Sequence, residues 1–342
     1  MSRLRVVQIS ESAFSVKGHG VHTAFVETVR ALEARDDVDV MANSFASADI
    51  RHIHTVGPYS LAQLLFATGK KVVSAHVVPD SFVGSLIGAK YWLKAARGYL
   101  RWFYNRADAV VAVSQETAAV LKDMGVTTTI TVVYNMIDTS VYQRDESRRA
   151  SVREKIGVDE NTFVVVGNGQ VQPRKRVDTF VRLARELPEM HFVWVGGLPF
   201  GKVAANHAEI NELIHTAPSN VTFTGVVELD EVRNFFAAGD VFVMTSEQET
   251  FGLAIIEAAA SGLPVVLRDI HDYDDTFRPD AVMASEESFA SEIQRLATDN
   301  THYLDMQKHA ALIAKRFDSH EICDTLVSLY HSALRSNNGI ID

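Results

Sequence analysis

The 342-residue sequence contains a single cysteine, Cys323. One cysteine cannot form an intrachain disulfide or a cysteine-based zinc site, so we expect a fold held by packing alone in a reducing, cytoplasmic setting. No His/Cys cluster has the spacing of metal ligands, and no Ser-His-Asp catalytic triad can be identified in the sequence. The composition therefore excludes a small disulfide scaffold and gives no support to metal or serine-hydrolase chemistry.

Long apolar runs are also missing. No stretch reaches the roughly 18 to 20 unbroken apolar residues that span a bilayer, and the N-terminal run MSRLRVVQIS predicts a strand instead of a signal peptide. Hydrophobic residues make up 47% and charged residues 22%, which is typical of a globular protein and excludes wholesale disorder. A chain of this length predicts two domains, at roughly 150 residues each.

Positive charge is scarce in the second half of the chain. The net charge is −10, from 33 Lys/Arg and 43 Asp/Glu. Residues 1–145 hold 15 basic and 13 acidic side chains, so the remainder holds 18 and 30. An acidic chain is a poor general binder of nucleic acid, whose phosphates need a basic surface. If the protein binds an anionic surface, we expect the N-terminal half to make the contact.

Short β-branched runs alternate with helical stretches in two series. The expected strands are 4–10, 49–56, 70–78, 107–114, 130–137, 162–170, 191–197, 220–227, 240–246 and 263–269, and the expected helices are 21–35, 114–125, 177–188, 228–239 and 251–262. Such alternation predicts α/β domains with parallel, doubly wound sheets. We expect Rossmann-like domains at 1–145 and 146–317, joined by a polar link at 134–157. We also expect a ligand cleft between them and a C-terminal helix, 318–342, packed on the first.

The segment SEQETFGLAIIEAAASGLPVV contains two glutamates, Glu249 and Glu257, eight residues apart. A helix starting near Phe251 would place Glu249 just before it and Glu257 in its second turn. The backbone N–H groups from Phe251 to Leu253 would then form an anion site, which a phosphate can approach closely at Gly252. The alternative is that Glu249 only complements the helix dipole and Glu257 is a solvated side chain.

The run from Glu249 to Glu257 resembles the Glu-x7-Glu motif of the family-4 retaining glycosyltransferases of the GT-B fold, and the resemblance covers the whole chain. It implies two facing Rossmann-like domains and a hexosyltransferase whose C-terminal domain holds a nucleotide-sugar donor. Glu249 would hydrogen-bond the transferred hexose, and Glu257 would bind the ribose hydroxyls. Carboxylates suit both roles because an ionised acid accepts two good hydrogen bonds from a diol.

The loop GNGQVQPRKRVDTF follows an expected strand and is rich in glycine and base. Lys175 resembles the family lysine that binds the donor diphosphate, where a cation neutralises the leaving nucleotide. The family carries an arginine where this chain has Gln170, so Arg174 or Arg176 is expected to supply that charge. The alternative is a solvated basic loop. A dinucleotide fingerprint is not expected, because the third glycine is absent and Pro173 intervenes.

The N-terminal half offers a glycine loop and three histidines. Gly18 and Gly20 lie in SVKGHGV, and Gly20 matches the family glycine whose N–H faces the donor phosphate; a tight turn is the alternative. The resemblance places His76 against the transferred sugar, where a neutral imidazole orients a hydroxyl or shares charge at an oxocarbenium-like centre. The alternative is an ordinary hydrogen-bonding histidine at a strand end. His54 and His52 are weaker candidates.

The string Asp272-Tyr273-Asp274 is the one metal-like motif that we considered. An Asp-x-Asp string binds manganese in a different glycosyltransferase fold, but here it follows a strand in a polar loop, which favours a turn. The resemblance implies no bound catalytic metal and no cofactor other than the donor, with Mg²⁺ at most a stimulator.

Residues 84–106 contain five bases and no acid. At roughly 100° per residue, one helical stripe holds Lys90, Lys94, Arg97 and Arg101, and the opposite one holds Trp92, Ala95, Ala96, Tyr99, Trp102 and Phe103. This pattern predicts a basic amphipathic helix that lies on an anionic membrane surface, each base contributing ~1 kcal/mol. The alternative is that the aromatic stripe packs on its own sheet while the bases face solvent.

The stretches HVVPDSFVGSL, 84–106 and WVGGLPFG together are similar to bacterial 1,2-diacylglycerol 3-alpha-glucosyltransferases, which make glycolipids and lipoteichoic acid anchors. The resemblance implies UDP-glucose as donor, diacylglycerol as acceptor, and a cytoplasmic enzyme peripheral at the inner face of the membrane. Two alternatives stay open. One is an enzyme with a small-molecule or protein acceptor, and the other is a non-catalytic nucleotide-sugar-binding subunit, which Gln170 would favour. The sequence leaves the nucleotide, the hexose, the acceptor and the oligomeric state undetermined.

Overall fold

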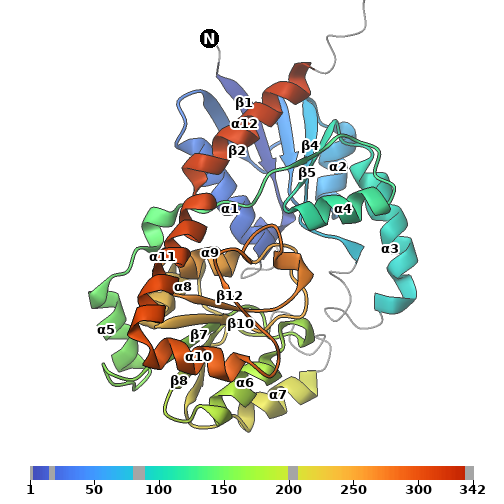
Figure 1. Cartoon of the computed structure of the whole chain (residues 1–342). Helices are drawn as coiled ribbons and strands as arrows, with labels where there is room; N and C mark the ends of the chain where they lie inside the picture. Colours follow the sequence, from blue (N-terminus) through green and yellow to red (C-terminus); the bar gives the residue numbers. More distant parts are fainter. Residues whose placement is uncertain (1–2, 15–19, 80–88, 199–206, 336–342) are drawn as a thin grey trace, which may run out of the picture. The chain divides into compact units, whose positions relative to one another are not determined.

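The computed structural model describes residues 3–14, 20–79, 89–198 and 207–335 (Figure 1), with the side chains of 89–92 and 207–208 left out. The chain forms two compact units. The first contains the elements up to Asp138 together with those from Phe317 onward, and the second contains Thr139–Arg316. Gly18 and much of the stretch 76–86 lie outside the described residues.

The first unit is built on a six-stranded parallel sheet in the order β2-β1-β3-β4-β5-β6. Its strands are β1 (Leu4–Ile9), β2 (Val38–Ala42), β3 (Ile50–Ile53), β4 (Lys70–Ala75), β5 (Ala109–Ala112) and β6 (Ile130–Val132). From β1 the chain first adds β2 on one side of the sheet, and it then adds β3 to β6 on the other side. The topological switch point, where ligands of such sheets bind, therefore lies at the carboxyl ends of β1 and β3.

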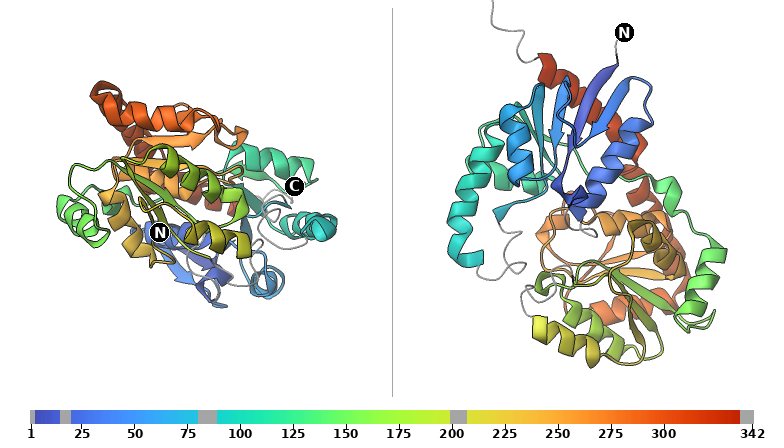
Figure 2. Two further views of the ribbon diagram at one scale, coloured as in Figure 1. Left: turned by 90° about the horizontal axis from the view of Figure 1, so that it is seen from below. Right: turned by 180° about the vertical axis from the view of Figure 1, so that it is seen from behind.

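Helices cover both faces of this sheet, as Figure 1 and the rear view in Figure 2 show. They are α1 (Gly20–Glu33), α2 (Pro58–Phe66), α3 (Ala89–Tyr104), α4 (Gln115–Asp123) and α12 (Ser319–Arg335). Because successive strand residues point to opposite faces, Val6 packs with α1 and α12, whereas Val7 packs with α2, α3 and α4. The C-terminal helix thus contributes to the first core through Leu326 and Tyr330.

The second unit repeats the plan with the strand order β12-β11-β10-β7-β8-β9. Its strands are β7 (Val164–Asn168), β8 (His191–Val195), β9 (Val221–Phe223), β10 (Val241–Met244), β11 (Val265–Arg268) and β12 (Val282–Ala284). The parallel neighbours β7 and β10 lead to opposite halves of the sheet. The switch point of the second unit is therefore at their carboxyl ends.

Seven helices are described in the second unit: α5 (Glu146–Lys155), α6 (Val177–Glu186), α7 (His207–His215), α8 (Leu229–Ala238), α9 (Leu253–Ala260), α10 (Phe289–Thr298) and α11 (Asn300–Arg316). One face of the sheet packs with α6, α7 and α10 around Phe180 and Trp194. On the other face, Phe242 of β10 meets Phe236 of α8 edge-on. Among the described residues, no helix is both long enough and apolar enough to cross a membrane.

The expected strands are all present, but the sequence pattern missed two strands and several helices. The overlooked strands, β2 and β12, are short and lie at sheet edges, where one-sided burial weakens the apolar signal. The boundary between the two units, after Asp138, lies inside the stretch predicted as the link, 134–157, and the same stretch also contains α5. Arg149, which is half-buried, and Arg153, which is buried, attach that helix to the unit: both bind Asp240 and the carbonyls that end α8.

Candidate active site

Two charged side chains, Lys175 and Glu249, meet at the switch point of the second unit. Lys175 ends the 3-10 turn η4 (Pro173–Lys175), which follows β7, and Glu249 lies in the loop after the neighbouring strand β10. Lys175 Nζ donates to Glu249 Oε1, and both side chains are buried. The fold thus joins the two motifs that the sequence separates by 74 residues.

The pair forms a small buried electrostatic centre with Arg174. Arg174 Nη1 lies 3.7 Å from Glu249 Oε2 and donates to the carbonyl of Gln248 at 3.1 Å. Burial alone would raise the pKa of Glu249, but Lys175 and Arg174 outweigh it, and the pKa of this carboxyl is lowered. Burial lowers the pKa of Lys175, and Glu249 opposes that shift. The Glu249 carboxylate is therefore held ionised by two cations.

Helix α9 begins at Leu253, two residues after Phe251, and Gly252 is its N-cap residue. Gly252 has φ 91°, a left-handed conformation that ends the preceding loop and that glycine adopts freely. The amide of Gly252 precedes the helix and that of Leu253 is its first, so neither has an acceptor within α9. The ring of Phe251 packs on Phe277, so its side chain belongs to the core.

Glu257 lies on α9, one turn beyond Leu253, and is only 4% exposed. The alternative of a solvated side chain is therefore wrong. Acidic side chains are rarely buried to this extent without a structural or functional partner. Glu249 and Glu257 thus remain the two candidate carboxylates of the donor site, one before α9 and one within it.

The loop that carries Lys175 is fixed at both ends. Trp194 Nε1 of β8 donates to the Gly169 carbonyl at 3.0 Å, and the hydroxyl of Thr245, just after β10, donates to the Lys175 carbonyl at 2.8 Å. Gly169 has φ 142°, and a Cβ placed there would lie 3.2 Å from Lys175 Cε. The close approach of this glycine is therefore part of what orients the lysine.

The structure separates the two arginines that were candidates for the charge missing at Gln170. Arg176 has φ 49° and binds Asp178 and Glu247 near the surface, whereas Arg174 contacts the Glu249 carboxylate. Gln170 Oε1 accepts from Gln172 at 2.7 Å. The geometry favours Arg174 as the replacement, and the burial of Lys175 contradicts a fully solvated loop.

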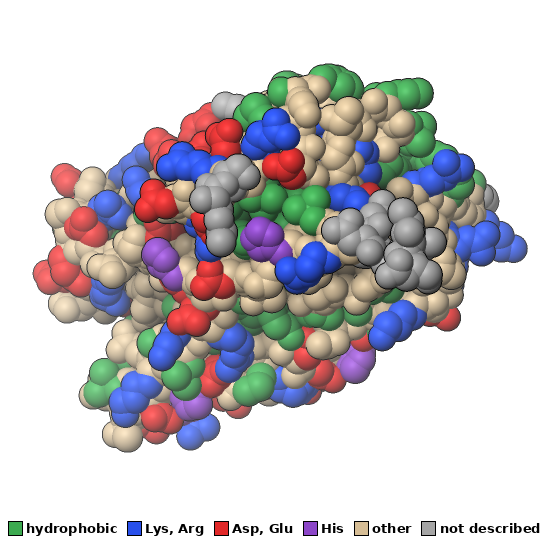
Figure 3. All heavy atoms as spheres, turned by 90° about the horizontal axis from the view of Figure 1, so that it is seen from above, with side chains coloured by type: hydrophobic (Ala, Val, Ile, Leu, Met, Phe, Trp, Pro, Cys, Tyr) green, Lys and Arg blue, Asp and Glu red, His purple; other side chains and the backbone are tan. Residues whose placement is uncertain are grey.

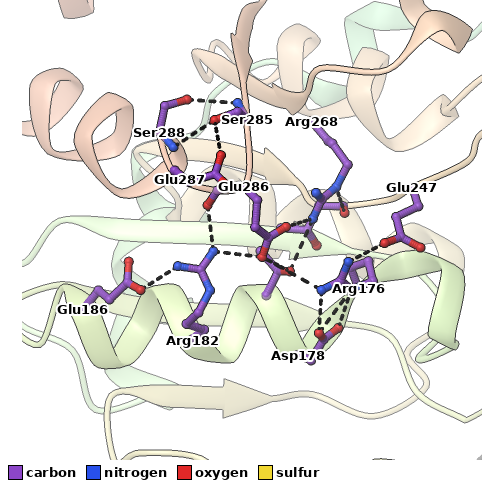
Figure 4. Close-up of polar contacts among 12 residues, drawn as sticks. Arg176, Asp178, Arg182, Glu186, Glu247, Arg268, Ser285, Glu286, Glu287 and Ser288 are labelled. Atoms are coloured by element: carbon purple, nitrogen blue, oxygen red, sulfur yellow. Dashed lines mark hydrogen bonds and ion pairs between the residues drawn. The ribbon is translucent and has the colours of Figure 1, made fainter.

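A network of charged side chains that the sequence analysis missed lies next to the loops that carry Lys175 and Glu249 (Figure 4). Arg268 ends β11; its Nε donates to the Thr245 carbonyl at 2.7 Å, and its Nη2 lies 2.6 Å from Glu286 Oε2. Glu286 Oε1 also accepts from Thr179 and Arg182. Burial tends to raise the pKa of Glu286, but these three partners lower it to about 2. The sequence signal for Glu286 was absent because the strand that it follows, β12, was itself missed.

The Asp272-Tyr273-Asp274 string lies in and beside the 3-10 turn η6 (His271–Tyr273). Asp272 Oδ2 accepts from the amide of Glu249 at 2.7 Å, and Asp274 binds His271 and Arg278. The first aspartate thus holds the loop of Glu249 in place, a role that the sequence did not indicate. In the part of the chain that the structure describes, no group of three or more His, Cys, Asp or Glu is arranged to hold a metal ion.

In the first unit, His76 follows β4 directly and is buried. Its Nε2 lies 3.0 Å from Nδ1 of His54, whose Nε2 lies 2.7 Å from Gln8 Oε1. Gly20 is the first residue of α1, and a Cβ added there would have none of the described atoms within 4 Å. Packing against the described residues therefore does not require a glycine at this helix start.

Helix α3 differs from the expected division into a basic and an aromatic face. It buries Leu100, Phe103 and Tyr104, whose spacing forms one core-facing stripe. Tyr99 and Trp102 are instead 37% and 38% exposed. They share the surface with Lys94, Arg97 and Arg101, and basic side chains gather at the right-hand edge of Figure 3, where α3 lies in Figure 1. The side chains of Lys90 and Trp92 lie outside the described ones.

Two family models together match most of the chain. The model described as Glycosyltransferase Family 4 matches residues 22–141, and the one described as Glycosyl transferases group 1 matches residues 160–299. The first match lies mostly in the first unit, and the second lies in the unit that contains Lys175 and Glu249.

Curated relatives and solved structures agree with these matches. The chain is 34% identical to an alpha-galactosylglucosyldiacylglycerol synthase of Streptococcus pneumoniae, covering 79% of this chain and 74% of the relative. It is 26% identical to a processive diacylglycerol alpha-glucosyltransferase of Acholeplasma laidlawii, covering 84% and 85%. In fold it matches the Anabaena protein HepE, solved with UDP and glucose, with a TM-score of 0.76 at 20% identity over 96% of this chain and 100% of that one. The chain therefore belongs to the family-4 glycosyltransferases of the GT-B fold and is a hexosyltransferase.

Proposed function

We propose that this enzyme transfers a hexose, with glucose as the first candidate, from a UDP-sugar to the hydroxyl of a lipid such as diacylglycerol, with retention of configuration. The observation that carries the donor side is the buried Lys175–Glu249 pair at the switch point beside the start of α9. The lipid acceptor is supported by the names of the curated relatives, two of which are diacylglycerol glycolipid enzymes.

The donor is held by the second unit in this proposal. The diphosphate replaces Glu249 as the partner of Lys175 and Arg174, and it accepts from the amides of Gly252 and Leu253 at the positive end of α9. Glu249, released from the lysine, accepts hydrogen bonds from the hexose hydroxyls. Glu257 accepts from the ribose hydroxyls.

The reaction needs no protein nucleophile. The bond between the sugar C1 and the diphosphate oxygen breaks, the acceptor oxygen bonds to C1 on the same face, and the acceptor proton moves to the departing phosphate oxygen. Lys175 and Arg174 neutralise the charge that develops on that phosphate, so the chain's own cations supply the stabilisation that we do not assign to a bound metal. His76 is proposed to contact the transferred sugar.

Helix α3 carries the membrane part of the proposal. Exposed Lys94, Arg97 and Arg101 lie with the half-exposed rings of Tyr99 and Trp102, which stack at 6.2 Å. Bases beside amphipathic aromatic rings are typical of helices that rest on an anionic leaflet. We propose that the enzyme binds the inner face of the membrane in this way and makes glycolipids that serve as lipoteichoic acid anchors.

Reversing three charges on α3 is expected to release the enzyme from anionic vesicles. Because each base contributes ~1 kcal/mol at such a surface, the variant Lys94→Glu/Arg97→Glu/Arg101→Glu should bind at least about 100-fold more weakly. Flotation with phosphatidylglycerol vesicles at low salt measures this. The control Lys122→Glu/Lys308→Glu/Lys315→Glu changes the net charge equally at exposed lysines elsewhere and should still float. Equal losses in both variants would contradict a role for α3.

A mixed assay read by mass spectrometry tests the whole function. UDP-glucose, UDP-galactose and UDP-N-acetylglucosamine are offered together with diacylglycerol vesicles and with a set of small hydroxylated acceptors. We expect a hexosyl-diacylglycerol product, with UDP released in equal amount and α-linkage shown by NMR. Transfer only to a small-molecule acceptor would overturn the lipid proposal and leave the hexosyltransferase assignment in place.

A further inference from the structure

Helix α2 has no charged side chain, and it exposes its apolar side. At roughly 100° per residue, one side of the helix carries only apolar and aromatic residues: Pro58, Tyr59, Leu61, Ala62, Leu65 and Phe66. Leu65 is 41% and Phe66 80% exposed, whereas Ser60 and Gln63, on the opposite side, are fully buried. A surface helix of a globular protein normally buries its apolar side and exposes charged side chains. The arrangement in α2 is the reverse.

Buried polar contacts hold α2 in this orientation. Gln63 Oε1 accepts from Arg51 at 2.7 Å, and Gln63 Nε2 donates to Tyr59 Oη at 2.9 Å. At the start of the helix, the amides of Tyr59 and Ser60 donate to Glu11 Oε1. Rotation of the apolar side into the core would break the contacts of Gln63 and take an acceptor from the fully buried guanidinium of Arg51. The outward position of the apolar side is therefore fixed by the fold of the first unit.

Two exposed phenylalanines extend the apolar side of α2 at its N-terminal end. The rings of Phe14 and Phe45 each meet the ring of Tyr59 edge-on, with centroids 5.8 Å apart. The carbonyls on either side of Phe45 accept from the buried Arg51 at 2.6 and 2.7 Å, so the loop that exposes this ring is itself held in place. Contiguous exposed apolar groups mark interaction sites. We call five of these residues the α2 patch: Phe14, Phe45, Tyr59, Leu65 and Phe66.

The α2 patch lies beside the basic surface of α3. Tyr99 Oη of α3 donates to the carbonyl of Val56, two residues before α2, at 2.6 Å, and Figures 1 and 2 show the two helices side by side. Lys94, Arg97 and Arg101 are exposed on α3, and neither α2 nor the stretch 84–106 contains an acidic residue. A second copy of the chain at this surface would bring like charges together. An anionic leaflet offers charges of the opposite sign and, beneath them, hydrocarbon.

The N-terminal end of the α2 patch lies at the carboxyl edge of the sheet. Phe14 follows β1 through the 3-10 turn η1 (Glu11–Ala13), Phe45 follows β2, and Tyr59 lies in the first turn of α2, soon after β3. The switch point of the first unit is at the same edge, at the ends of β1 and β3. A lipid whose hydroxyl reached this edge would have apolar side chains next to its acyl chains.

We propose that the α2 patch enters the hydrocarbon layer of an anionic leaflet while the bases of α3 contact the headgroups. The inference rests on the proposed membrane function and adds an apolar contact to it. Salt screens the attraction between exposed bases and headgroups, but it does not weaken the transfer of apolar side chains out of water. The α2 patch should therefore provide the part of vesicle binding that persists at high salt.

The depth of α2 in the bilayer is measured with a nitrobenzoxadiazole label at Phe66→Cys, in the full-length enzyme carrying Cys323→Ser. On vesicles of phosphatidylglycerol and phosphatidylcholine, the emission should shift to the blue and be quenched by lipids with a nitroxide on the acyl chain. The same label at Leu304→Cys, an exposed position of α11, should report water throughout. A label at position 66 that stays in water on vesicle-bound enzyme would overturn the inference and leave binding through α3 in place.

Flotation at high salt tests the contribution of the patch to binding. Leu65→Ser/Phe66→Ser should bind vesicles about 10- to 100-fold more weakly than wild type at high salt, because the apolar contact is lost, and less weakly at low salt. The control Leu304→Ser/Leu312→Ser removes two exposed leucines from α11 and should bind as wild type. Equal losses in the two variants would contradict a specific role for α2.

The remaining outcomes distinguish this inference from the proposed function. Wild-type enzyme that binds no anionic vesicles at any salt concentration would overturn both the membrane part of the proposed function and this inference. Normal vesicle binding and product formation by Leu65→Ser/Phe66→Ser would overturn this inference alone. A wild-type dimer in analytical ultracentrifugation that this variant converts to a monomer, with vesicle binding unchanged, would assign the patch to a second copy of the chain instead.

Discussion

Lys175→Met is expected to lower the turnover of hexosyl transfer by about 100- to 1000-fold, the effect of losing one preorganised charge-stabilising donor. The lysine lies within hydrogen-bonding reach of Glu249 at the carboxyl ends of β7 and β10. Among the described residues, no other lysine forms an ion pair with Glu249. Turnover is measured as UDP released from UDP-glucose in the presence of acceptor vesicles.

The same substitution is also expected to destabilise the protein, and a second change separates the two effects. Without Lys175, the buried Glu249 carboxylate keeps Arg174, at 3.7 Å, as its one ion-pair partner among the described residues, and breaking a buried ion pair costs about 3 to 5 kcal/mol. The double variant Lys175→Met/Glu249→Gln removes both charges and should regain much of the free energy of unfolding in urea without regaining turnover.

The exposed Lys315→Met serves as the control and should behave as wild type in both measurements. Two results would contradict a direct role for the pair. One is a Lys175→Met variant that keeps more than about a tenth of the wild-type rate. The other is a double variant whose turnover recovers together with its stability, since that would mean that the lysine acts only through folding.

Gly196→Ala should destabilise the second unit by at least about 3 kcal/mol and weaken UDP binding. Gly196 follows β8 with φ 129°, a conformation that costs other residues about 1 to 3 kcal/mol. An added Cβ would also lie 2.2 Å from the carbonyl oxygen of Gly169. The methyl group would meet a backbone atom, which cannot rotate away as a side chain can. Because Gly169 also packs on Lys175, a shift of Gly169 would displace the lysine.

Its matched control is Gly225→Ala, since Gly225 pairs with Gly196 in an isolated bridge and has φ 69° but open space around its Cβ position. This variant should lose only about 1 kcal/mol, the cost of the left-handed conformation. Urea unfolding followed by circular dichroism, with UDP titration of the folded variants, measures both. Equal losses in the two alanine variants would show that backbone strain, and not the contact with Gly169, governs this turn.

Local patterns were enough to predict two α/β domains and much of the candidate site. Each buried strand of a parallel sheet has its own apolar run, and each helix start has its own capping and glycine chemistry, so these signals need no knowledge of distant residues. Glu249, Glu257 and Lys175 were singled out by their resemblance to short family motifs, and their roles stay predictions. Edge strands such as β2 and the polar helix α5 escaped because their stability comes from partners elsewhere in the chain.

The sequence by itself therefore determined the class of fold and the basic character of α3, and it singled out the two glutamates and the lysine as candidates. Only the tertiary structure decided that Lys175 binds Glu249, that Tyr99 and Trp102 are exposed, and that Tyr330 joins the histidines 278 residues earlier in the chain. The physical reason is that such contacts depend on strand order and helix docking. Strand order and helix docking depend on how the whole core is buried. A local sequence pattern does not show which distant side chains are brought together in that core.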